Sequence, residues 1–498
     1  MVQTNKENSI EKTKELIEAA MRAGRRLQSS QTGYIHHYYH SQDQDPQQTI
    51  PILENALFVL TLFRTRLVDN MNEAKEMLGR LLVFQCQQGA AKGNFPIYLH
   101  HYPECLDRYV GILLLAPLYW ILKLFGHVLG QELRGKLESS IKEIFSYGLQ
   151  LEKEIPLPYS IQVRFAAAKM AYGTLFSNSE LVNNGTIELK SLCELNHNDS
   201  WHMTAYLSDL LIGLQMAYPS IKNSPWATFW KYLERTWHRQ TCCYVGPCIK
   251  ELQKHEEPQI TYYDIFMSYF SDQSAGRIKK NNSYINLHGA LVQPSDDTIE
   301  IFNYPFDLEG THNSQSWVIF HDNACAVTLL DKKIALNPHL EQTYTPYRFV
   351  WGDETCAHSL VCQGGSALID CHRHKGFVEL FFHLDNEIDI EHPTRQKEIN
   401  FYLDVFPGIQ IKVENQATNT FEFGQEIIVH SGGAKLSFSF DLIEGEGQFL
   451  GHISRGNRPS QLDLKGENRY NSYDWNLFIR TIRRSNKCLI KARISFEG

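Results

Sequence analysis

The chain has 498 residues, of which 43% are hydrophobic and 21% are charged, and its formal net charge is −8. This length exceeds what one hydrophobic core usually serves, so two domains are expected. The acidic balance argues against a nucleic-acid-binding surface, which normally carries a basic excess. The longest charge-free apolar stretch, Tyr109 to Leu122, contains Pro117 and is shorter than the ~20 residues that span a bilayer.

The first twenty residues are polar and charged, without the apolar segment and small-residue cleavage site of a secretory signal. We therefore expect a cytoplasmic protein. The eleven cysteines are odd in number and irregularly spaced, which predicts reduced thiols rather than a framework of disulfides.

The first half of the chain has the apolar spacing of successive helices. Between Ile52 and Val68, for example, apolar side chains recur at positions 53, 56, 57, 60 and 63. The predicted helices are Ser9–Leu27, Ile52–Val68, Asn72–Gln87, Glu104–Phe125, Gln131–Leu151, Ser160–Phe176, Ser200–Ala217, Pro225–Arg239 and Tyr262–Phe270.

From about Tyr284 the pattern changes to short apolar or alternating runs separated by turn residues such as Pro407-Gly408. Many short strands at regular spacing are typical of a sandwich or barrel. The predicted strands are Tyr284–Leu287, Trp317–Phe320, Ala324–Leu330, Phe377–Phe382, Ile399–Leu403, Ile409–Val413, Phe421–Phe423 and Lys435–Phe440. The sequence therefore predicts a multidomain protein, α then β, with a helical domain over residues 1–275 and an antiparallel β domain over 276–498.

The first candidate site is the segment from Asn198 to Tyr206. Asp199 or Ser200 is suited to cap a helix, which would put His202 and Tyr206 four residues apart on one face. Trp201 offers a flat surface on which a sugar could stack. An ordinary capped amphipathic helix would give the same pattern, so both interpretations remain open.

The second candidate is a loop rich in aromatic and histidine residues, which leads into the most apolar helix. It carries His100, His101 and Tyr102, followed by Asp107 and Arg108. The arginine offers a planar fork that fits a carboxylate, and the aspartate could bind a hydroxyl. An Asp-Arg pair that only pins the loop is the alternative.

Two further places could contribute to a site. Arg164, after a proline-rich turn, is a second candidate for carboxylate binding, with a surface ion pair as its alternative. The run from Tyr34 to His40 is dense in tyrosine and histidine and could line a sugar site or form a polar surface loop. The cysteine and histidine groups at 238–255 and 371–374 lack the paired spacing of zinc modules, so no metal and no cofactor is expected.

Helical hairpins followed by a large antiparallel β-sandwich resemble the polysaccharide lyases and heparinase II/III-like proteins. The resemblance is one of element order over almost the whole chain. It implies an incomplete α/α toroid before the sandwich and β-elimination at a uronic acid, with general acid–base catalysis. Carried onto this sequence, it assigns the catalytic roles to Asn198, His202, Tyr206 and Arg108. In the family the catalytic asparagine usually comes from an earlier helix, so Asn198 departs from that pattern.

The same resemblance implies substrate-binding roles for the remaining candidates, which are Trp201, Asp107, His100, His101, Tyr102 and Arg164. The expected partner is an acidic carbohydrate, with no nucleic acid and no membrane. Two alternatives stay open. A glycoside hydrolase on a similar toroid would need two carboxylates ~5 to 10 Å apart, for which Asp107, Asp209 and Asp264 are available. A non-catalytic carbohydrate-binding or scaffold protein would need neither.

Overall fold

The computed structural model describes residues 2–37, 49–196, 204–241, 243–246, 262–270, 284–295, 297–300, 302–312, 315–323, 325–330, 334–335, 347–353, 356–364, 368–374, 376–384, 396–403, 409–431, 434–455 and 475–497. Contacts divide these residues into two compact units. The helical unit takes in the described residues up to Lys231 and those between 262 and Ile299. The β unit takes in Tyr232 to Gly246 and the described residues from Glu300 onward.

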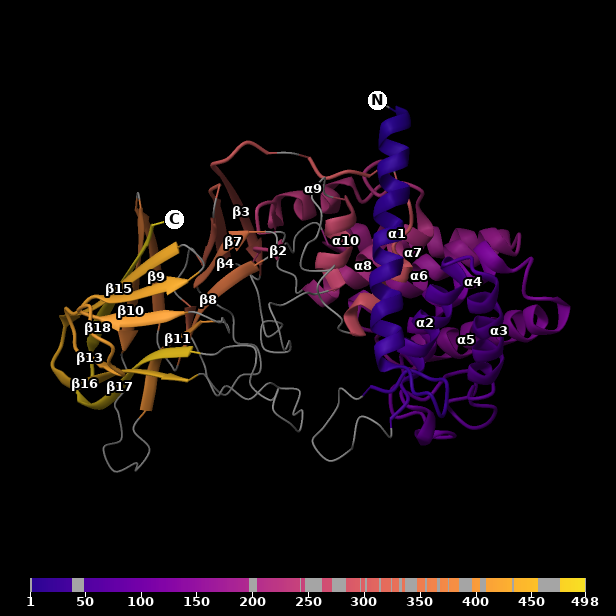
Figure 1. Cartoon of the computed structure of the whole chain (residues 1–498), viewed down its shortest axis with the longest axis horizontal. Coiled ribbons are helices and arrows are strands. Elements are labelled where there is room, and N and C mark those ends of the chain that lie inside the picture. The colour runs from indigo at the N-terminus through magenta and orange to yellow at the C-terminus, as the bar shows by residue number, and fades with distance from the viewer. Residues whose placement is uncertain are drawn as a thin grey trace. The chain divides into compact units, whose positions relative to one another are not determined.

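The helical unit is built from long helices (Figure 1). They are α1 (Val2–Leu27), α2 (Ile52–Arg64), α3 (Val68–Leu82), α4 (Val110–Phe125), α5 (Gln131–Glu154), α6 (Tyr159–Leu175), α7 (Ser179–Asn196), α8 (Thr204–Ala217) and α10 (Tyr262–Phe270), with the 3₁₀ helices η2 (Leu99–His101) and η4 (Tyr284–Leu291). Helix α9 (Ala227–Thr236) crosses the boundary between the units. The predicted helical first part is confirmed.

The helices pack in a regular order. Each of α2, α4 and α6 contacts the helix that follows it, and α2, α4, α6, α8 and α10 also contact one another in succession. Helix α1 contacts both α2 and α10. Nearly every side chain of α4 is buried, as expected for a helix with neighbours on several sides.

Helix α7 is absent from the sequence-based prediction. Its sequence is polar and contains Asn183, Asn184 and Gly185, which are weak helix formers. The glycine is explained by packing, because a Cβ at Gly185 would lie 2.6 Å from the carbonyl oxygen of Ala166 on α6. Tertiary contact therefore stabilises a helix that local propensity does not favour.

Residues 284–287, predicted as a strand, instead begin the 3₁₀ helix η4, every residue of which after Tyr284 is buried. Its backbone is held by side chains from the surrounding helices. Arg64 on α2 donates to the carbonyl oxygens of Ala290 and Val292 at 2.5 and 2.7 Å. This apolar segment is therefore buried among helices, where two carbonyl groups at its C-terminal end are satisfied by an arginine instead of a neighbouring strand.

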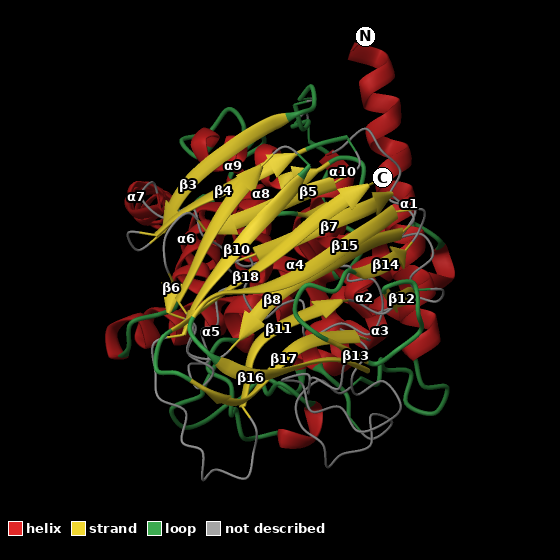
Figure 2. Ribbon diagram, turned by 90° about the vertical axis from the view of Figure 1, so that its left-hand side faces the viewer, coloured by secondary structure: helices red, strands yellow, loops and turns green. Residues whose placement is uncertain are grey.

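The β unit contains two large antiparallel sheets, whose strands Figure 2 shows in yellow. One has the order β12-β14-β15-β18-β10-β9-β6 and the other β13-β16-β17-β11-β8-β7-β5-β4-β3. The strands are β3 (Phe306–His312), β4 (Gln315–His321), β5 (Cys325–Leu330), β6 (Ile334–Ala335), β7 (Tyr347–Asp353), β8 (Cys356–Gly364), β9 (Leu368–His374), β10 (Phe377–Leu384), β11 (Gln396–Leu403), β12 (Gln410–Val413), β13 (Thr420–Phe421), β14 (Ile427–Ser431), β15 (Ala434–Glu444), β16 (Gly447–Arg455), β17 (Trp475–Arg484) and β18 (Cys488–Glu497).

The sheets share one apolar core. Strand β10 alternates between buried and half-buried side chains along its whole length, the period expected when one face of a strand is fully covered. Buried residues from both sheets, such as Phe401 on β11 and Phe438 on β15, belong to one hydrophobic cluster, and their rings are 5.9 Å apart. The predicted antiparallel β-rich second part is confirmed.

A two-residue hairpin precedes the large sheets. Strand β1 (Trp237–His238) pairs with β2 (Cys243–Tyr244), earlier than the strand pattern predicted, and belongs to the β unit. Among the helices described here, none has the length and hydropathy needed to cross a membrane.

Candidate functional site

The directions of three helices place several candidate residues at one end of the helical unit. On α6 and α8, Tyr159 stacks on Tyr206 with ring centroids 5.5 Å apart, and Arg164 pairs with Asp209. A Cβ at Gly213 would lie 3.4 Å from that of Ala167. Because the contact positions rise together along both helices, α6 and α8 run parallel and begin at the same end.

Helix α4 runs in the same direction. Arg164 on α6 donates to the carbonyl oxygen of Leu113 at 2.9 Å, and further along both helices Tyr172 meets Tyr119 with ring centroids 5.2 Å apart. We call the end of the helical unit where α4, α6 and α8 begin the shared N-terminal end. Arg108 lies two residues before α4, and Tyr206 lies in the first turn of α8.

Arg164 is buried in the interior, with 6% of its surface exposed. One guanidinium nitrogen is 2.8 Å from a carboxylate oxygen of Asp209, and the other donates to Leu113. That carbonyl needs an outside donor because Pro117, four residues later in α4, has no N–H to close the helical hydrogen bond. Arg164 therefore joins three helices and offsets the missing backbone donor.

A histidine that the sequence analysis did not single out lies close to this arginine. His288 on η4 is buried and stacks on Tyr262 at the start of α10, with ring centroids 3.7 Å apart. Burial and the positive charge of Arg164 lower the pKa of His288 to about 3. Its ring is therefore neutral at physiological pH. No sequence spacing predicts this group, because His288 and Arg164 are far apart in the chain and the segment around His288 has an apolar, strand-like pattern.

Tyr206 and Tyr159 form a chain of hydroxyl groups. The phenol of Tyr206 is hydrogen-bonded to that of Tyr159, whose hydroxyl donates to the carbonyl oxygen of Leu192 on α7. Burial, and then the Tyr159 hydroxyl, raise the pKa of Tyr206 well above its usual value. Tyr206 consequently keeps its proton at neutral pH, as a proton donor must.

Asn198, Trp201 and His202 lie outside the described residues. In the sequence they stand directly before α8, which begins at Thr204.

The second candidate loop is held by backbone and side-chain hydrogen bonds. A carboxylate oxygen of Asp107 accepts from the backbone N–H of Tyr109 at 2.6 Å, so Asp107 fixes the entry into α4. Asn94 donates to the carbonyl oxygen of Asp107 at 2.9 Å, and Tyr147 donates to that of Arg108 at 3.0 Å. The side chain of Arg108 is exposed.

The three aromatic residues of this loop lie in and just after η2. The rings of His100 and His101 meet edge to face, with centroids 4.4 Å apart, and Tyr102 packs its edge against Phe84. His100 and Tyr102 are exposed, whereas His101 is half-buried. Burial, and then the neighbouring His101, lower the pKa of His100, which favours its neutral form.

Two cysteine thiols meet beneath this loop. The Sγ atoms of Cys86 and Cys105 are 2.8 Å apart, and Cys86 also donates to the carbonyl oxygen of Pro103. Burial, and then Cys86, raise the pKa of the Cys105 thiol, which favours its protonated form.

The carboxylates considered for a hydrolase have different surroundings. Asp107 accepts a hydrogen bond in the turn before α4 and Asp209 pairs with Arg164, whereas Asp264 is buried on α10 with 3% of its surface exposed. Within the described ranges no three histidine, cysteine or carboxylate side chains are grouped closely enough to hold a metal ion.

Comparison with known proteins identifies solved structures with a similar architecture. No protein-family model matches the sequence, and no curated protein matches it significantly. Among solved structures, a chondroitin AC lyase from Streptomyces coelicolor A3, in complex with chondroitin sulphate, matches with a TM-score of 0.51 and 7% identity, covering 97% of this chain and 79% of the lyase.

Two other matches are more distant. A heparinase III has a TM-score of 0.36 and 10% identity over 89% of this chain and 78% of its own. A glycoside hydrolase has a TM-score of 0.28 and 7% identity over 88% and 90%. The similarity that carries weight is therefore the one to the chondroitin lyase, and it concerns the fold. The chain has the polysaccharide lyase-like architecture that the order of its elements indicated.

Proposed function

We propose that the chain is a carbohydrate-active enzyme that cleaves uronic-acid-containing saccharides by β-elimination. In this proposal the helical unit is an incomplete toroid of helical hairpins and the β unit is a sandwich. The successive contacts among α2, α4, α6, α8 and α10 support the toroid. The likeness to a chondroitin lyase over 97% of the chain supports the reaction class at the level of fold.

The observation that carries the proposal is the shared N-terminal end of α4, α6 and α8. It brings the start of α8, which bears Tyr206, to the same end as the loop that bears Arg108. Asn198 and His202 precede α8 by only a few residues in the sequence. Tyr206, from the stretch chosen as a catalytic group, and Arg108, from the carboxylate-binding loop, thus belong to neighbouring elements at one end.

Elimination would use these side chains as follows. Arg108 and Asn198 neutralise the uronate carboxylate, so that the proton on the adjacent C5 becomes acidic. His202 removes that proton, the electron pair forms a C4–C5 double bond, and the C4–O bond breaks. Tyr206 donates its proton to the departing oxygen. The raised pKa of Tyr206 argues against a role as the base, because a tyrosine acting as base would have to be ionised.

The other candidates hold or line the site. Trp201, His100, His101 and Tyr102 would contact the sugar rings, together with Asp107. Arg164 has a structural role in this proposal, whereas the sequence suggested that it binds the substrate carboxylate. Because its guanidinium is buried against Asp209 and Leu113, it would act by keeping α6 and α8 in register beneath Tyr206.

The mass of the products tests the proposal. The full chain is incubated with a panel of uronate-containing polymers, and the oligosaccharides are analysed by mass spectrometry. Elimination adds no water, so one new end is unsaturated and each product set sums to the mass of the substrate. Hydrolysis adds one water for every bond cleaved. If all products carry this added water, the protein is a hydrolase and not a lyase. If the polymers bind the protein but are not cleaved, it is a non-catalytic carbohydrate-binding protein.

A further inference from the structure

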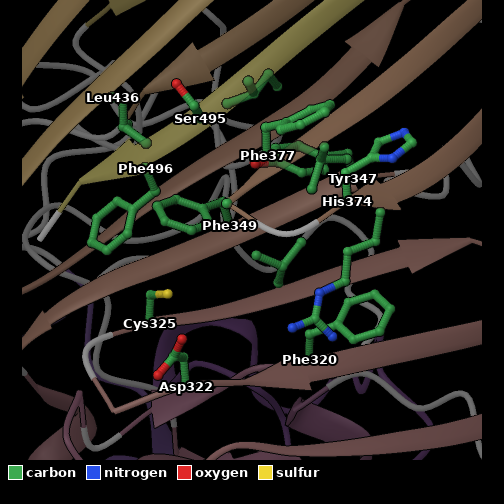
Figure 3. Close-up of a pocket in the computed structure, with 15 residues that line it drawn as sticks. Phe320, Asp322, Cys325, Tyr347, Phe349, His374, Phe377, Leu436, Ser495 and Phe496 are labelled. Carbon is green, nitrogen blue, oxygen red and sulfur yellow. The ribbon is translucent and has the colours of Figure 1, made fainter.

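The β unit contains a pocket between its two sheets that the proposed function does not use (Figure 3). One wall comes from β4, β5 and β7, and the other from β9, β10, β15 and β18. Its volume is about 130 Å³. A cavity of ~150 Å³ lined by apolar side chains is known to stay dry and to hold benzene, so this pocket has room for one six-membered ring.

The lining is chiefly aromatic and aliphatic. Figure 3 shows Phe349, Phe377 and Phe496 around the space, with Leu436 and Tyr347 beside them. A sugar ring would have to bury several hydroxyl groups here with few partners, and each unpaired hydroxyl is costly. An apolar or aromatic ring has no hydroxyl groups to desolvate, so the pocket walls favour such a ring over a saccharide.

Two arginines stack on phenylalanines that line the pocket. The guanidinium carbon of Arg373, which lines the pocket, lies 3.8 Å from the ring centroid of Phe320. That of Arg493, which does not line the pocket, lies 3.9 Å from the centroid of Phe377. Asp322 is the acidic residue among the lining side chains.

The two arginines differ in their pairing. Arg373 makes an exposed ion pair with Asp307 at 3.1 Å, in which the two side chains are 37% and 55% exposed. Arg493 pairs with no carboxylate within the part of the chain that the structure describes. An exposed pair is weak enough to be exchanged for another carboxylate, and a planar guanidinium fits one well. Arg373 can therefore accept the carboxylate of a ligand whose ring lies in the pocket.

We propose that this pocket binds a small aromatic monocarboxylate, with its ring between the sheets and its carboxylate on Arg373. The residues that line the site all belong to the β unit, and none belongs to the shared N-terminal end of the helical unit. The site would make the β unit a sensor or carrier of an aromatic acid in addition to its part in the fold, and its existence does not depend on the lyase reaction.

Calorimetric titration of the full chain with benzoate, benzyl alcohol and glucuronate tests the proposal. Benzoate and benzyl alcohol share the ring and differ in charge, whereas glucuronate shares the carboxylate and replaces the ring by a sugar. We expect benzoate to bind at least ~10-fold more tightly than benzyl alcohol, the scale of one charge-assisted hydrogen bond, and glucuronate not to bind this pocket.

Three variants assign the binding to the pocket. Arg373→Gln, at an exposed position that should not affect folding, should remove the preference for benzoate. Val327→Phe fills the pocket and should abolish binding. Ile411→Phe is the matched control, because Ile411 is half-buried against the same core but lies on the edge strand β12 and does not line the pocket.

Several results would overturn the proposal. They are an absence of benzoate binding at millimolar concentration, equal affinity for benzyl alcohol, unchanged binding in folded Val327→Phe, and glucuronate binding that Val327→Phe removes. Arg373→Gln removes the guanidinium at an exposed position and leaves the apolar walls in place, so its effect on the preference for benzoate decides the question even if the filled variant fails to fold.

Discussion

Replacing Arg164 by methionine tests the internal connection between α4, α6 and α8. The change removes a guanidinium that is paired with Asp209 and bonded to Leu113. Breaking a buried ion pair costs about 3–5 kcal/mol, and we take the lower end because the Asp209 side chain is 27% exposed. The carbonyl left without a donor adds about 1–3 kcal/mol. The expected loss in unfolding free energy is therefore ~4 kcal/mol.

The contribution of the Leu113 carbonyl can be separated from that of the ion pair. In a Pro117→Ala background, residue 117 regains its N–H and can close the helical bond to Leu113. Arg164→Met should then cost about 1–2 kcal/mol less than in the natural chain. Denaturant unfolding followed by far-ultraviolet circular dichroism, which reports the helices, measures both losses. Equal losses in the two backgrounds would refute the assignment of Arg164 to that carbonyl, and a loss below ~1 kcal/mol would refute the buried pair.

Three further predictions concern buried charges, protons and thiols. Lys169 is 1% exposed and pairs with Glu152 and Glu188 at 2.8 Å, so Lys169→Met should lose about 2–3 kcal/mol at pH 7. The loss should be smaller at pH 4, because burial raises the pKa of Glu152 and its protonated form pairs less strongly with Lys169. Burial lowers the pKa of His288 and of His321 to about 3. The unfolded chain protonates both histidines below pH ~6.5, whereas the folded chain keeps them neutral. Each histidine should therefore lower the unfolding free energy by about 2 kcal/mol as the pH falls from 6.5 to 5. The His288→Gln variant should lack the contribution of His288 to this pH dependence. Diamide treatment should join Cys86 to Cys105, whose sulfurs are 2.8 Å apart, and peptide mapping without reductant that finds only free thiols would contradict this proximity.

Much of the fold can be predicted from the sequence because the periodicity of its hydrophobic residues is pronounced. The continuous apolar run of α4 and the alternation along β10 are determined by local pattern. The wrong predictions of secondary structure arise where tertiary contacts, and not local sequence, determine the conformation. The polar sequence around Gly185 forms a helix because its glycine packs closely on α6, and the segment around His288 forms a 3₁₀ helix because Arg64 bonds the carbonyl groups at its end.

The candidate site is predicted only in part, for a related reason. Spacing along one helix places Tyr206 and Asp209 on neighbouring turns, and this can be read from sequence. What Arg164 contacts depends on Pro117, a residue of another helix, and no single-sequence pattern connects the two. The proximity of His288 to Arg164 depends in the same way on the burial of η4.

The rate at which an unsaturated uronate appears, with and without the Tyr206 hydroxyl, tests the proposed reaction most directly. The new C4–C5 double bond is conjugated to the carboxylate and absorbs in the near ultraviolet, so turnover can be followed continuously. Tyr206→Phe removes only the proton donor and should slow the absorbance rise by ~100-fold or more. Tyr119→Phe, whose hydroxyl on α4 interacts with Lys123, should turn over at the natural rate. Equal rates for Tyr206→Phe and the natural chain, or no absorbance rise with any uronate polymer, would contradict the account.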